Sequence, residues 1–76
     1  MKFSNLTLNQ AKMHLSNFVL DEFGFSADNL LNIIEAVRSP DELQTVVNKL
    51  IPHLKSNQAK DLMSLWMEIN TAMKRD

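Results

Sequence analysis

The sequence predicts an all-α fold, a compact single domain of four helices arranged as a bundle or as two packed helical hairpins. Apolar residues recur at helical spacing along most of the chain, and helix start and stop signals divide it into four segments. One glycine and two prolines leave little room for long loops, while a hydrophobic content of 45% is too high for a disordered chain. The expected helices span residues 8–23, 27–38, 40–50 and 57–74, with residues 1–6 as a flexible lead.

The first helix has a clear start and a clear end. Thr7 followed three residues later by Gln10 forms a capping box, in which each residue's side chain bonds the other's backbone N–H. Gly24 is the residue type that most often ends a helix, because it adopts positive φ without steric cost. These two signals predict a helix over 8–23.

The next two helices are expected to follow with short connections. Ser26 is a candidate N-cap for the helix over 27–38. The run "SPDE" at 39–42 then supplies an N-cap serine, a proline at the first helical position and a glutamate that closes a capping box. This is a strong start signal for the helix over 40–50.

The last helix is expected after a proline. Pro52 disfavours helical geometry at the residue before it, so the third helix should end near Leu50. Ser56 is the candidate N-cap of the helix over 57–74.

The apolar face of the last helix is wider than one side of contact requires. At about 100° per residue, Met63 and Met67 lie about 100° and 140° from Leu62, beyond the apolar stripe of a packed surface helix. On the first helix, Met13 also falls outside the core arc. The residues of the core arc of the last helix lie within about 60° of Leu62: Leu62, Leu65, Trp66, Ile69 and Met73.

Two interpretations of this wide face stay open. In the first, the last helix is the central helix of the bundle and is buried on most sides. In the second, Met63, Trp66, Met67 and Met13 form a surface that binds another protein or a second copy of the chain, giving a homodimer. The second interpretation predicts a small, non-enzymatic interaction or regulatory module.

The charge distribution suggests nucleic acid as an alternative partner. The net charge is −1, but residues 21–48 are acidic and residues 49–76 are slightly basic. In this alternative, a nucleoid or transcription regulator, four basic side chains contact phosphates. We rank it second, since the helix over 40–50 is too poor in basic residues to read DNA. The phosphate-contact candidates are Lys55, Lys60, Lys74 and Arg75.

No residues suggest catalysis, a metal site or a cofactor. The chain has no cysteine, and its two histidines, His14 and His53, lie far apart in sequence without a convergent ligand set. A single glycine excludes a glycine-rich phosphate loop. No apolar run has the length of a membrane span and no signal peptide precedes the first helix, so we expect a cytoplasmic protein that is not an enzyme.

Two family comparisons fail on particular residues. The run "ADNL" is similar to the attachment motif of acyl carrier proteins, but Asn29 stands at the serine position and cannot carry a phosphopantetheine arm. The hydrophobic spacing from Leu31 into the last helix resembles that of the small nucleoid-associated modulators of haemolysin expression. The chain lacks their arginine pair and their Asp-His-Arg signature, so we assign no family.

Overall fold

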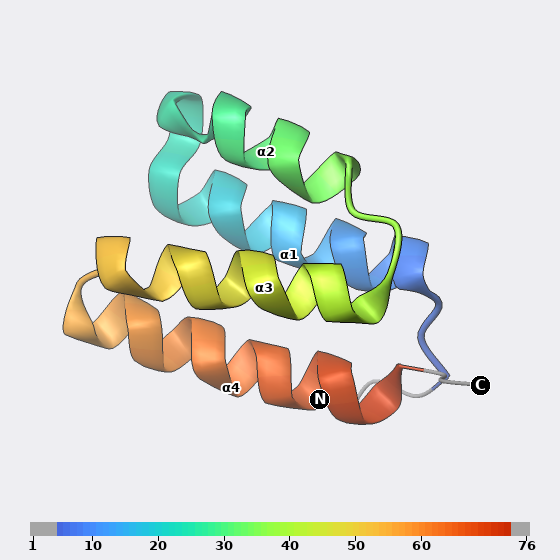
Figure 1. Ribbon diagram of the computed structural model, residues 1–76. Coiled ribbons are helices and arrows are strands. Elements are labelled where there is room, and N and C mark those ends of the chain that lie inside the picture. The colour runs from blue at the N-terminus through green and yellow to red at the C-terminus, as the bar shows by residue number, and fades with distance from the viewer. Residues whose placement is uncertain (1–4, 74–76) are drawn as a thin grey trace.

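The computed structural model describes residues 5–73, apart from the side chain of Phe25. This part contains four α-helices and no strand: α1 Leu8–Phe23, α2 Asp28–Glu35, α3 Pro40–Leu50 and α4 Ser56–Ala72 (Figure 1). Two short 3-10 turns, η1 Gly24–Ala27 and η2 Ile51–His53, join α1 to α2 and α3 to α4. The predicted all-α class with four helices is confirmed.

The four helices form a closed ring of neighbours. Consecutive helices run in opposite directions (Figure 1). Of these helices, α1 contacts α2 and α4, and α3 contacts the same two. The radius of gyration is 11.6 Å, close to the value of about 11.4 Å expected for a compact chain of this length. The arrangement is therefore a compact up-and-down bundle.

Helix α1 has the predicted start and end. The Thr7 hydroxyl accepts from the Gln10 N–H at 3.1 Å, and the Gln10 side-chain oxygen accepts from the Thr7 N–H at 2.9 Å. At the other end, the Gly24 N–H donates to the Leu20 carbonyl, and Gly24 has φ 56° and ψ −126°. This positive φ explains the glycine, although its ψ lies outside the left-handed helical region.

Helix α2 differs from the prediction at both ends. Ser26 lies inside η1 and Ala27 takes the N-cap position without a side-chain hydrogen bond, so the prediction of a Ser26 cap was wrong. The helix ends at Glu35, three residues before the expected end. The Lys12 ammonium of α1 donates to the carbonyls of Glu35 at 2.7 Å and Val37 at 2.9 Å. Lys12 therefore replaces the hydrogen bonds that further helical turns would supply.

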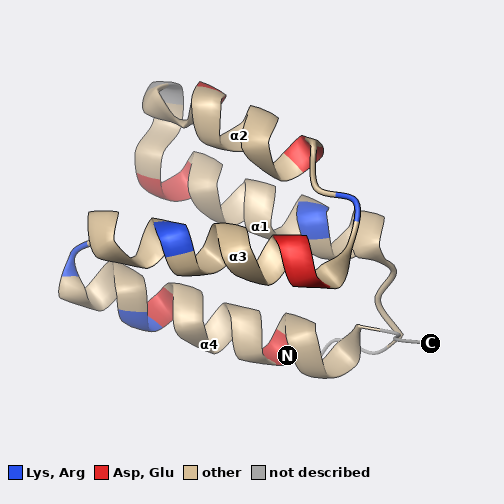
Figure 2. Cartoon of the chain, viewed as in Figure 1, with Lys and Arg blue, Asp and Glu red and all other residues tan. Residues whose placement is uncertain are grey.

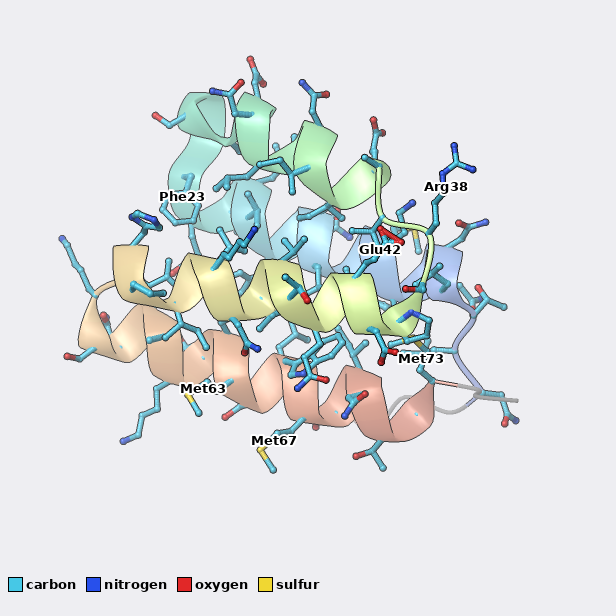
Figure 3. All side chains as sticks on the ribbon, in the orientation of Figure 1. Phe23, Arg38, Glu42, Met63, Met67 and Met73 are labelled. Atoms are coloured by element: carbon cyan, nitrogen blue, oxygen red, sulfur yellow. The ribbon has the colours of Figure 1, made fainter. Side chains whose placement is uncertain are left out.

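Helix α3 begins where the run at 39–42 predicts. The Ser39 hydroxyl accepts from the Glu42 N–H at 3.2 Å. The Glu42 carboxylate accepts from the Arg38 N–H at 3.3 Å, one residue before the position that a capping box uses (Figure 3). The acidic first turn, with Asp41 and Glu42, also stabilises the helix dipole.

Helix α4 begins one residue earlier than expected. Ser56 is its first residue and Lys55 occupies the N-cap position, so Ser56 does not cap the helix as predicted. The Lys55 N–H donates instead to the side-chain oxygen of Gln58 at 3.1 Å. The helix ends at Ala72, and residue 74, the expected end, lies outside the described residues.

All buried residues in the described part are apolar and form one cluster. Helices α1, α3 and α4 each contribute three of them, whereas α2 contributes one. The spacing of three or four residues within each helix places its buried side chains on one face. The core consists of Leu6, Ala11, Leu15, Val19, Ala27, Ile34, Val37, Leu43, Val47, Leu50, Leu62, Trp66, Ile69 and Met73.

The segment before α1 pairs with the end of α4. The Leu6 N–H donates to the Ala72 carbonyl at 3.0 Å, and Leu6 and Met73 form an isolated parallel bridge. Both of these side chains belong to the core. The N-terminal segment 1–6 is expected to be flexible, and residues 1–4 of it lie outside the described residues.

Candidate functional site

Two methionines lie on the outer side of α4. Met63 is 51% exposed and Met67 is 67% exposed. Figure 3 shows both side chains pointing away from the other helices. Because they are four residues apart, they stand one turn apart in a row along the helix. The interpretation in which α4 is buried on most sides is therefore wrong.

The packing of α4 explains this exposure. Among the described helices, α4 makes its main contacts with α1 and α3. The buried side chains Leu62, Trp66 and Ile69 lie within about 40° of Leu62. Met63 and Met67 are turned by about 100° and 140°, outside the arc that these neighbours cover.

Trp66 does not contribute to the exposed row. Its side chain is only 7% exposed and belongs to the core cluster. Trp66, predicted as a contact residue, therefore lies on the core side of α4. It instead fixes the helix that presents the methionines.

The residues beside the exposed methionines are mostly small or uncharged. Ser56, Asn57, Ala59, Lys60 and Met63 line a shallow, open hollow of about 570 Å³. Helical geometry places four exposed residues within about 60° of one another on this side. We call these four residues the methionine strip: Ser56, Lys60, Met63 and Met67.

Charge is segregated around α4. Lys60 is the charged residue of the methionine strip, whereas Asp61 and Glu68 lie more than about 100° from its centre. These charges on α4 can be followed in Figure 2. The 100° rule predicts Lys60 beside Met63 and Met67, and Lys60 is also one of the predicted phosphate contacts.

Met13 lies at a separate place. It is 54% exposed on α1 and lines a second open hollow, together with Lys12 of α1 and Glu35 of α2. The two hollows share no lining residue. Met13 therefore lines a different hollow from the one that Met63 lines.

The predicted phosphate contacts are described only in part. Lys55 is exposed at the N-cap of α4, and Lys60 is exposed on its second turn. Lys74 and Arg75 lie outside the described residues. The described structure thus places one of these four candidates, Lys60, on the methionine strip.

The described residues include no group of three or more histidine, cysteine or acidic side chains that could hold a metal ion. His14 lies on α1 and His53 in η2. Within the same part of the chain, no helix combines the length and apolar character needed to cross a membrane.

Comparison of the chain with protein-family models, with curated proteins and with solved structures found no match.

Proposed function

We propose that this protein is a small, non-enzymatic interaction and regulatory module that binds a partner through the methionine strip. The observation that carries the proposal is the exposure of Met63 and Met67, side by side on the face of α4 that no other helix covers. Full burial of a methionine side chain stabilises a complex by roughly 1.5–3 kcal/mol. A partner that covers this row gains part of that free energy for each residue.

Methionine suits such a contact. Its unbranched side chain and polarisable sulfur adapt to irregular apolar surfaces. The backbone beneath it is fixed, because Leu62, Trp66 and Ile69 anchor the opposite side of α4 in the core. Binding therefore has to order side chains only, because the helix backbone is already ordered. This lowers the entropic cost of binding.

The proposal allows two kinds of occupant, a different protein or a second copy of this chain. In either case the apolar row supplies affinity, and nearby charges orient the partner and affect the rate of encounter. The solution mass separates the two, since a self-associated dimer has twice the mass of the 8.7 kDa monomer.

Photo-cross-linking tests the proposal. A photoreactive phenylalanine analogue replaces Met67 in one variant and Glu68 in a control variant, expressed in the native host. Both positions are exposed and adjacent in sequence, but they point about 100° apart. We expect discrete protein cross-links from position 67 and not from position 68. Identical products from both positions, or no protein product from position 67, would refute the proposal.

A further inference from the structure

We infer that the methionine strip binds an amphipathic helix of a different protein, one with apolar side chains a turn apart and acidic side chains along one edge. This inference rests on the proposed function and specifies the chemistry of its partner.

The shape of the strip favours a helix. Met63 and Met67 form an i, i+4 row inclined by about 26° to the axis of α4, and such rows pack into the grooves between equivalent rows on another helix. The backbone of a helix interior is already hydrogen-bonded, so it offers no edge to which an extended peptide could add as a strand. Recognition must use side chains, and the hollow beside Met63 can receive a bulky apolar one.

The charge of the strip favours an acidic partner. Lys60 is exposed at the edge of the row, and helical geometry directs Asp61 and Glu68 to other sides of α4. Lys55, at the N-cap of the helix, adds a second positive charge near the same end. A carboxylate on the partner would meet Lys60, whereas an ammonium would be repelled.

The same features argue against a second copy of the chain. Two copies joined by their strips would bring together surfaces that both carry a lysine and no acidic residue. The methionine strip covers residues 56–67 of α4, about 18 Å of helix, so at a width of about 10 Å it offers roughly 180 Å². A stable dimer buries about 800 Å² per partner. A single docked helix instead forms a weak, transient contact.

Methyl NMR on the full chain tests the inference with two synthetic peptides. Both are 15-residue helices with leucines four residues apart, and one carries glutamates where the other carries lysines. We expect the acidic peptide to shift the methyl signals of Met63 and Met67 more than that of buried Met73. Its affinity should be about two- to fivefold higher than that of the basic peptide, the range of an exposed ion pair.

Two charge-reversal variants provide the control. Lys60→Glu should reverse the order of the two peptides. Lys49→Glu, on α3, should preserve that order, although each substitution changes the net charge from −1 to −3. Because the change in net charge is the same, only a local role of Lys60 separates the two variants.

The possible results distinguish the inference from the proposed function. Equal affinity for both peptides would overturn the acidic specificity, while specific cross-links from position 67 would still support the proposed function. No shift of Met63 or Met67 with either peptide would overturn the helix-docking inference. A dimer in light scattering that is lost in Met67→Glu would identify a second copy as the occupant, and would overturn the inference while supporting the proposed function.

Discussion

Met67 and Met73 form a matched pair for testing where the core ends. Met67 is 67% exposed on α4, whereas Met73, directly after that helix, is 5% exposed and belongs to the core cluster. Figure 3 shows the first pointing outward and the second pointing inward. Truncation to alanine removes the same atoms at both positions. The difference in free energy of unfolding between Met67→Ala and Met73→Ala therefore measures the effect of burial.

The expected losses in free energy of unfolding differ by several fold between Met73→Ala and Met67→Ala. Truncation of a buried methionine costs about 2–5 kcal/mol, from lost transfer free energy and the cavity left behind. Met73 lies at the end of α4, where neighbours can relax, so we expect about 2–3 kcal/mol. Truncation of Met67 should change stability by less than about 0.5 kcal/mol. A folded domain of this length has a total stability of roughly 4–11 kcal/mol, so the effect at Met73 is large.

Urea unfolding measures both values, with fluorescence of buried Trp66 as the probe and far-UV circular dichroism as the check. At a slope of about 1 kcal/mol per molar, Met73→Ala should lower the midpoint by about 2–3 M and Met67→Ala by less than about 0.5 M. The protein is kept at a concentration where light scattering shows a monomer. If Met67→Ala destabilises as much as Met73→Ala, the outer side of α4 is buried and the methionine strip is not a surface.

Two further predictions test local features of the fold. Lys12→Met should lower the free energy of unfolding by about 1–3 kcal/mol, because the carbonyls of Glu35 and Val37 lose a charged donor. The control Lys49→Met should change it by less than about 0.5 kcal/mol in the same urea experiment. Gly24→Ala should cost about 1–3 kcal/mol in thermal unfolding. Since an added Cβ there meets nothing within 4 Å, this cost comes from the positive φ alone, and an unchanged melting temperature would contradict it.

The parts of the fold that follow from local sequence could be predicted. Helix α1 begins at a capping box whose partners, Thr7 and Gln10, are three residues apart. Helix α3 begins at Ser39, which bonds a backbone group three residues later. In both cases the side chain and the backbone group that it satisfies lie within one turn, so a short stretch of sequence contains the whole interaction.

The parts that depend on distant residues could not be predicted. Near the early end of α2, Lys12, more than twenty residues away in sequence, bonds the carbonyl of Glu35, the last residue of the helix, and that of Val37, two residues beyond it. The segment at Leu6 is fixed by a hydrogen bond to Ala72, near the other end of the chain. No spacing rule connects such residues, since their proximity exists only after the helices have packed.

The candidate surface lies between these two cases. Helical geometry correctly placed Met63 and Met67 outside the core arc, because that geometry depends only on spacing. It could not show whether another helix covers them, since the number of neighbours of α4 is a property of the packed bundle. The structure gives α4 two neighbouring helices, and the core is complete without either methionine. Folding therefore does not require apolar side chains at these positions, and we propose that a contact outside the chain accounts for their apolar character.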